Sequence, residues 1–336
     1  MIKGLVSKKI ERNIGLEIFR ALLSFWVVLF HCINFSKSFI LNYFLHKKFH
    51  VPCFFFISFY YLFPIIRDRN SYKMKRRLER LFIPYIIWPV FIWSINNLLY
   101  LFIGNNRYGR ILSFKELKLQ LITGRMFFIQ LWFVFNLLFL SIVFFIVSFL
   151  NEYIFLIFVN LIFILCYLIQ YSTSNYFFSQ FKDCISHSVG HFIISFPLAV
   201  SAFDLNKFKL IQYFDINRYK FLLFSLLVIG FLFIKGAPNT YYGIDKNLFS
   251  LFTFYWFYLI PLNEYLNQNF KNIIYFITSY TNGIYCTHII VKFYIYRCFM
   301  IKPTFLSCFG LYIFCYIISF FGEKTFQKNK LKFLFI

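Results

Sequence analysis

Apolar runs recur along the chain between residues 14 and 321, and short polar or basic segments separate them. Most of these runs are long enough to cross the hydrocarbon core of a bilayer as a helix, which takes about 20 residues. Those at 51–66, 189–203 and 221–234 are shorter. The pattern predicts an all-α polytopic membrane protein with ten spans, at 14–36, 51–66, 83–103, 127–149, 152–170, 189–203, 221–234, 248–266, 282–298 and 303–321.

The composition extends this interpretation to the whole chain. Its 336 residues are 60% hydrophobic and 25% aromatic, and the mean hydropathy is +0.68. No water-soluble core needs so much apolar surface. We therefore expect one integral membrane domain over residues 1–336 and no soluble domain. The first run is expected to stay in the protein rather than act as a signal peptide, because Glu17 and Arg20 interrupt it and no small-residue cleavage site follows.

The net charge of +23 has a topological meaning here. In a soluble protein such a charge points to nucleic acid, but these basic residues lie between apolar runs, so no nucleic-acid partner is expected. The positive-inside rule favours a multi-pass protein with both termini in the cytoplasm, because the segments on that side then carry more Lys and Arg. The basic outer segment 104–126 runs against this bias. Its Lys115-Glu-Leu-Lys-Leu-Gln pattern is typical of an interfacial helix.

The first apolar run holds Glu17, Arg20 and His31, which a purely structural span would not carry. Ionisable residues inside a membrane helix mark a functional site by default. Arg20 and His31 are three helical turns apart, about 16 Å along the axis, and share one face with Glu17. Two roles stay open for each group. Glu17 and Arg20 either neutralise one another or line a reaction path. His31 either forms a hydrogen bond to a neighbouring helix or acts as a general base.

The densest basic run contains Arg76, Arg77 and Arg80 and leads into Pro84. Arg77 and Arg80 are spaced i and i+3, so a helix would point both the same way. Two guanidinium forks at one place suit phosphate groups. The alternative is an ordinary positive-inside segment that touches anionic lipid.

A third polar cluster lies late in the chain and contains His288. This histidine is either a second catalytic group or a helix-packing residue. Lys292 and Arg297 follow it and are expected to extend their charged ends toward the membrane surface.

The other candidate ligands do not predict a metal site. His187 and His191 are spaced i and i+4, but no third ligand accompanies them. The eight cysteines contain no C-x-x-C pair, so we expect unpaired thiols rather than a disulfide framework or a zinc site.

Four stretches match one family in order. Glu17-Ile-Phe-Arg20 is followed by His31 eleven residues after the arginine; the later stretches are Val51-Pro-Cys-Phe-Phe-Phe-Ile-Ser58, Arg77-Leu-Glu-Arg80, and Asn282-Gly-Ile-Tyr-Cys-Thr-His288. Together they resemble the first helix, the second helix, the cytoplasmic R-x-x-R segment and the late Y-x-x-H motif of acyltransferase family three. These are polytopic O-acyltransferases that decorate bacterial surface polysaccharides.

The resemblance implies a ten-helix domain in the bacterial inner membrane. It implies transfer of an acyl group, acetyl by default, from cytoplasmic acyl-CoA to a hydroxyl of a surface polysaccharide or lipid-linked sugar, with membrane lipid around the protein and no metal. In the roles it implies, Arg77 and Arg80, with the adjacent Arg76, hold the CoA phosphates and His31 is the base. It further implies that Glu17 and Arg20 order or charge-balance the path, and that His288 is a second catalytic group.

Two residues depart from the family pattern. Phe59 follows Ser58 where the family has glycine, which puts close helix packing or acyl passage there in doubt because phenylalanine adds bulk. Glu17 replaces the commoner aspartate and keeps the charge.

Two functions without acyl transfer stay open. A glycolipid or polysaccharide flippase or exporter would line its route with polar groups but would not need the arginine pair. A passive membrane subunit that organises a synthase complex would need neither histidine nor arginine beyond folding. An enzyme would change the acyl content of the glycan, whereas an exporter would change its amount.

Overall fold

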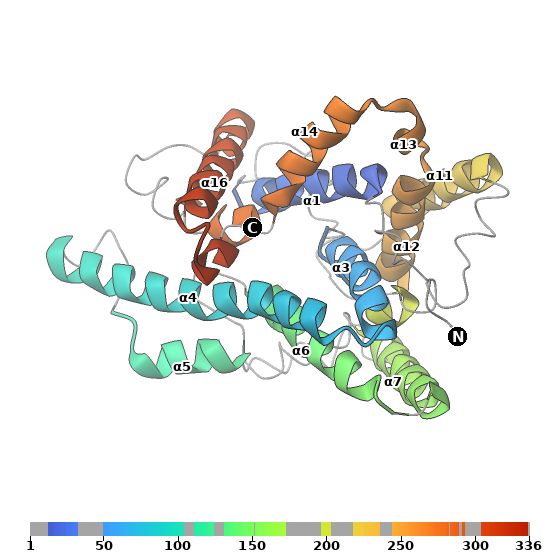
Figure 1. Ribbon diagram of the computed structural model, residues 1–336, viewed down its shortest axis with the longest axis horizontal. Coiled ribbons are helices and arrows are strands. Elements are labelled where there is room, and N and C mark those ends of the chain that lie inside the picture. Colours follow the sequence, from blue (N-terminus) through green and yellow to red (C-terminus); the bar gives the residue numbers. More distant parts are fainter. Residues whose placement is uncertain are drawn as a thin grey trace, which may run out of the picture.

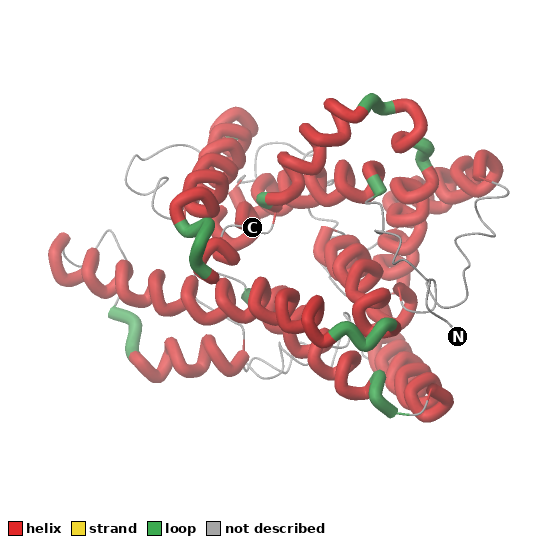
Figure 2. Tube along the Cα trace, viewed as in Figure 1, coloured by secondary structure: helices red, strands yellow, loops and turns green. Residues whose placement is uncertain are grey.

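The computed structural model describes residues 13–32, 50–103, 111–123, 131–150, 152–172, 196–202, 218–235, 244–281, 283–288, 291–292 and 304–334. Within these ranges every regular element is a helix and none is a strand, as Figure 2 shows. The all-α prediction is confirmed for this part of the chain.

Helix α1 (Ile14–Cys32) lies at the centre of the contacts that build the candidate site. It touches α3 (His50–Arg67), α12 (Ile244–Leu259), α14 (Gln268–Ser279) and α16 (Phe305–Thr325), which surround it in Figure 1. The other elements are α4 (Ser71–Ile103), α5 (Phe114–Thr123), α6 (Trp132–Val147), α7 (Glu152–Ser172), α11 (Arg218–Lys235), α13 (Leu262–Tyr265) and the 3-10 helix η2 (Lys330–Leu334).

The start of α1 is fixed against the end of α12. Asn13 caps α1, because its Oδ1 accepts a hydrogen bond from the Leu16 amide at 3.1 Å, while its Nδ2 donates to the Tyr258 carbonyl at 2.8 Å. Gly15 permits this approach, since a Cβ added there would come within 1.8 Å of the Phe257 carbonyl oxygen. The glycine therefore sets the distance between the two helices.

Aromatic side chains form the core next to α1. Phe55 and Phe56 of α3 are fully buried. The Phe55 ring lies 4.5 Å from that of Phe133 on α6, and the Phe56 ring lies 4.7 Å from that of Phe254 on α12, as measured between centroids. These tilted contacts join α3, α6 and α12 and are typical of aromatic pairs.

Four of the described helices are long and apolar enough to cross a membrane. They cover Ile14–His31, His50–Arg67, Ser71–Phe102 and Leu306–Thr325, which supports the expected spans 14–36, 51–66, 83–103 and 303–321. Trp132–Val147 and Ile157–Cys166 are apolar but shorter. Much of the expected spans 189–203 and 282–298 lies outside the described residues, so the count of ten stays a prediction.

Helix α4 joins the basic run and the expected span 83–103 into one helix of 33 residues. It begins where the Asn70 side chain accepts a hydrogen bond from the Lys73 amide at 2.9 Å, and it continues through Pro84 and Pro89. At 1.5 Å per residue it is about 50 Å long, which exceeds a hydrocarbon core of about 30 Å. We therefore place its basic first turns outside the hydrocarbon.

The expected span 248–266 is not one continuous helix. Helix α12 ends at Leu259, and the short α13 follows Pro261, whose ring removes a backbone donor. The next segment, treated as a connection in the sequence, forms α14. The prediction of a helix within 104–126 is confirmed by α5. This helix is attached to α4, because the Tyr85 hydroxyl donates a hydrogen bond to the Leu121 carbonyl oxygen at 2.6 Å.

Candidate active site

Glu17 and Arg20 form an ion pair one turn apart on α1. Arg20 Nη1 lies 3.0 Å from Glu17 Oε2 and 3.3 Å from Oε1. The Glu17 side chain is 1% exposed and that of Arg20 is 26% exposed, so the carboxylate is enclosed while the guanidinium reaches the edge of the site. The mutual neutralisation that the sequence allowed is therefore present, and the arginine keeps an accessible side.

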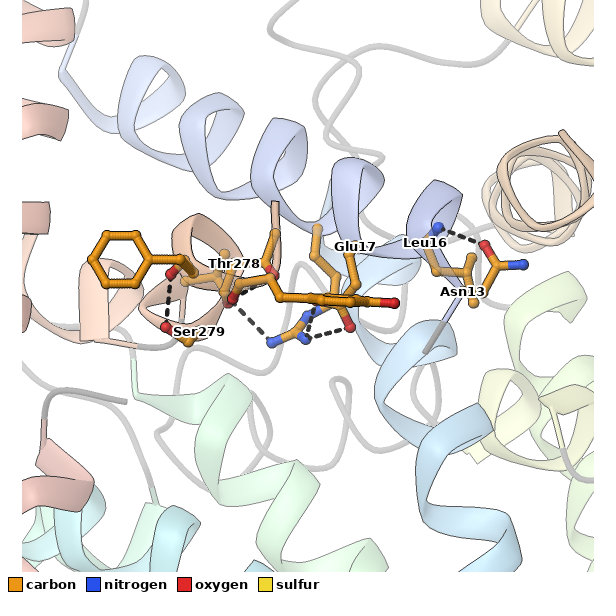
Figure 3. Close-up of polar contacts among 9 residues, drawn as sticks. Asn13, Leu16, Glu17, Thr278 and Ser279 are labelled. Carbon is orange, nitrogen blue, oxygen red and sulfur yellow. Dashed lines mark hydrogen bonds and ion pairs between the residues drawn. The ribbon is translucent and has the colours of Figure 1, made fainter. Parts of the chain in front are cut away.

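Arg20 also links α1 to Thr281, the residue just before the late motif. Its Nη2 donates to Thr281 Oγ1 at 3.0 Å, and the same hydroxyl donates to the Thr278 carbonyl at 3.0 Å. Both hydrogen-bonding roles of the threonine are thus used. Figure 3 shows this group of polar contacts between α1, where Glu17 is labelled, and the end of α14, where Thr278 and Ser279 are labelled. Sequence reasoning did not single out Thr281, because only the tertiary fold brings it to Arg20.

His31 and His288 lie together. Their ring centroids are 5.3 Å apart, with the planes tilted by 38°. His31 is in the last turn of α1, and His288 ends the helical residues 283–288. The two histidines that the sequence proposed from opposite ends of the chain therefore belong to one site.

The hydrogen bonds of His288 determine which of its nitrogens carries the proton. Nδ1 lies 2.7 Å from the Tyr285 carbonyl oxygen and 3.1 Å from that of Ile284. A carbonyl oxygen can only accept, so in the neutral ring Nδ1 carries the hydrogen and Nε2 carries the lone pair. Nε2 is buried and has no hydrogen-bond partner among the described residues. Nε2 therefore keeps a lone pair that no described residue uses.

Lys292 turns inward, contrary to the expectation that it extends toward the membrane surface. Its Nζ donates to the carbonyl oxygen of His31, at the end of α1 where backbone carbonyls lack partners within the helix. A cation there is favourable because it opposes the negative end of the helix dipole. Its position one turn after His288, together with its charge inside an apolar run, was the signal that sequence reasoning passed over. Arg297 lies outside the described residues.

Arg77 belongs to a second polar group, which joins three helices. Its Nη2 donates to Ser58 Oγ on α3 at 2.9 Å and to the Ser58 carbonyl at 3.3 Å. Its Nε donates to Ser141 Oγ on α6 at 3.2 Å. The guanidinium of α4 is thus held by the serine of the second-helix motif and by Ser141, which the sequence did not identify.

Arg76 and Arg80 differ from Arg77 in their exposure. Both are exposed, and each lies against an aromatic ring: the Arg80 guanidinium carbon is 5.9 Å from the centre of Phe333, and that of Arg76 is 5.7 Å from the centre of Tyr72. Of the three arginines, these two present their charged ends to the surroundings.

Phe59 is part of the packed core. It is 3% exposed, its ring stacks on Phe55 at 6.0 Å, and it lies 6.4 Å from Phe144 on α6. The bulk that replaces glycine therefore fills the contact between α3 and α6, next to the Ser58 that Arg77 holds.

The last candidates from the sequence are the possible metal ligands. His187 and His191 are outside the described residues. Within the described ranges, no three His, Cys, Asp or Glu side chains are grouped as a metal site.

Comparison with known proteins gives one match. Residues 13–323 match the family model described as an acyltransferase domain, Acyl_transf_3, which covers both polar groups and nearly the whole chain. No curated protein and no solved structure gives a significant match.

Proposed function

Since this chain belongs to acyltransferase family three, it is an enzyme that transfers acyl groups, and we propose that its donor is cytoplasmic acyl-CoA and its acceptor a sugar hydroxyl. The acyl group is acetyl, and the sugar belongs to a cell-surface polysaccharide or a lipid-linked precursor. The apolar helices and the family indicate a membrane protein. We place it in the bacterial inner membrane with both termini in the cytoplasm, where CoA is found.

The observation that carries this proposal is the pairing of His31 with His288. Transfer forms a bond between the sugar oxygen and the acyl carbon, breaks the bond from that carbon to the CoA sulfur, and moves the hydroxyl proton. His31 takes this proton as general base, a role that contributes about 10²–10⁴ in rate. The CoA thiolate leaves and is then protonated. His288 keeps a lone pair on Nε2 in the same place, where it accepts a hydrogen bond from the sugar hydroxyl or from protonated His31.

Arg20 orders the path between the two substrates. Glu17 balances its charge inside the apolar surroundings, and Thr281 fixes the direction of the guanidinium. The pair therefore places a cation at a set position without leaving a net buried charge. Its accessible side lies on the path, about three turns of α1 away from His31.

The arginines of the basic run have different roles in this account. Arg80 and Arg76 are exposed and hold the CoA phosphates through charge-assisted hydrogen bonds. Arg77 has three contacts to Ser58 and Ser141, so it sets α4 against α3 and α6. The sequence analysis assigned both Arg77 and Arg80 to phosphate binding. The contacts favour phosphate binding by Arg80 and a structural role for Arg77.

The proposal is tested by following the acyl group and the glycan separately. Membranes from cells that express the chain are supplied with acetyl-CoA labelled in the acetyl group, and label in the glycan is measured beside total glycan. An acyltransferase raises the label per sugar and leaves the amount of glycan unchanged. A change in amount with no label in the sugar would contradict acyl transfer and indicate export.

A further inference from the structure

A groove of about 580 Å³ lies between α4 and α6 beside η2. Its walls are apolar and come mainly from Met74, Leu78 and Phe82 on α4 and from Leu138, Ile142 and Phe145 on α6. The two helices contact one another. Phe82 is 53% exposed, so the apolar surface continues to the outside of the protein.

Charged residues line one edge of the same groove. Lys75, Glu79 and Lys330 all border it, and Lys330 Nζ lies 2.7 Å from Glu79 Oε1. This ion pair attaches η2 to α4 and balances one of the two lysine charges. Lys75 therefore gives this edge a net positive charge.

The charged and apolar parts are arranged along α4. Lys75 and Phe82 are seven residues apart, which is two turns or about 10 Å along the axis. The lysine belongs to the basic first turns and the phenylalanine to the apolar run that follows. A ligand lying along the groove thus meets positive charge at one end and hydrocarbon at the other.

We propose that this groove is a binding site for one anionic phospholipid. The phosphate lies at Lys75 and Lys330, and an acyl chain lies against Leu78, Phe82 and Ile142. Charge complementarity at the edge selects an anionic over a zwitterionic headgroup, and burial of the chain supplies the remaining affinity.

This site is separate from the arginines assigned to CoA. Leu78 and Phe82 lie one turn apart on one side of α4, whereas Arg76 and Arg80, each two residues from Leu78, project roughly half a turn around the helix from it. The proposal therefore does not depend on the proposed acyl donor, and its test reads lipid binding rather than activity.

Native mass spectrometry of the purified, delipidated protein in detergent tests the headgroup. The probes are phosphatidylglycerol and phosphatidylcholine with identical chains. We expect the protein to retain one molecule of phosphatidylglycerol tightly and to retain phosphatidylcholine more weakly. Lys75→Gln is expected to weaken phosphatidylglycerol about fivefold, since a basic residue near an anionic headgroup contributes about 1 kcal/mol. The matched control is Lys328→Gln, an exposed lysine that does not line the groove and whose loss leaves binding unchanged.

A second variant tests the proposed position of the lipid acyl chain. Leu78→Trp fills the groove and is expected to reduce retention of both lipids, and Ile142→Trp fills it from the other wall if the first variant does not fold. Equal retention of the two lipids, or an equal effect of Lys75→Gln and Lys328→Gln, would overturn the proposal. If Lys75→Gln reduced lipid retention but a folded tryptophan variant did not, the lipid would lie outside the groove, which would overturn the proposal as well.

Discussion

Arg20 Nη2 donates a hydrogen bond to Thr281 Oγ1 at 3.0 Å, which connects residues 261 positions apart in the sequence. Through this contact the charged pair of the first helix is held by the residue just before the late motif that supplies His288. Two segments far apart in the sequence are thus joined along α1.

Replacing Thr281 tests this connection. Thr281→Val keeps the shape but removes the acceptor of one Arg20 N–H, and a hydrogen bond to a charged group is worth about 1.5–3 kcal/mol. We expect the turnover of acyl transfer to fall about tenfold or more while the protein still purifies. The matched control is Thr253→Val on α12, where the hydroxyl donates only to its own helix at Phe249. An equal loss in both variants would reduce Thr281 to a packing residue.

Arg77 is expected to act on stability. Arg77→Lys keeps the charge but loses the fork that contacts Ser58 and Ser141 together, and hydrogen bonds to charged groups are worth about 1.5–3 kcal/mol each. We expect a clearly lower melting temperature in detergent. Ser141→Ala removes one of the contacts and should lower it by a smaller step. A lysine variant as stable as the wild type, with a raised KM for acetyl-CoA, would return Arg77 to phosphate binding.

Arg80 and Arg76 are expected to contribute to binding of acetyl-CoA. The double variant Arg76→Ala, Arg80→Ala should raise the KM for acetyl-CoA and leave kcat nearly unchanged, because phosphate contacts bind substrate and transition state about equally. With about 1.5–3 kcal/mol for each contact, the rise is at least tenfold. Melting should change little, since both arginine side chains are themselves exposed. An unchanged KM at normal protein levels would leave these residues a topological role alone.

Gly15 offers a test of the packing of α1 on α12. In Gly15→Ala the new methyl group meets the backbone oxygen of Phe257, which cannot move aside as a flexible side chain can. We expect a loss of about 1–3 kcal/mol or more, seen as low yield or early melting. Gly310→Ala on α16 is the control, because nothing lies within 4 Å of its added Cβ. Equal behaviour of the two variants would contradict the close approach of the helices.

Local spacing predicted the parts of the site that a single helix determines. The Glu17–Arg20 pair follows from the i and i+3 positions, and α3 and α16 follow from uninterrupted apolar runs. Pro261 carried a signal for the end of α12 that the length of the apolar run obscured. The prolines of α4 mislead in the opposite direction, because helices in a membrane tolerate proline more readily than helices in water do.

The charge of Lys292 was a signal in the sequence, but the partners of Thr281, Ser141 and Lys292 could not be predicted from it. Each is a short polar or cationic residue in an apolar or mixed segment, and its partner lies on another helix. Spacing along one helix says nothing about that partner. The tautomer of His288 likewise depends on the carbonyl of Tyr285, whose position only the folded helix sets.

The most direct test of the account is acyl transfer by His31→Ala. The purified variant, its insertion and melting checked against wild type, is given saturating labelled acetyl-CoA and acceptor, and transfer to the sugar is measured between pH 5 and 9. We predict a loss of about 10²–10⁴ in rate and of the rise in rate through the range where histidine titrates, because only a neutral imidazole accepts the hydroxyl proton. Wild-type turnover with an unchanged pH profile would contradict the assignment of His31 as the base.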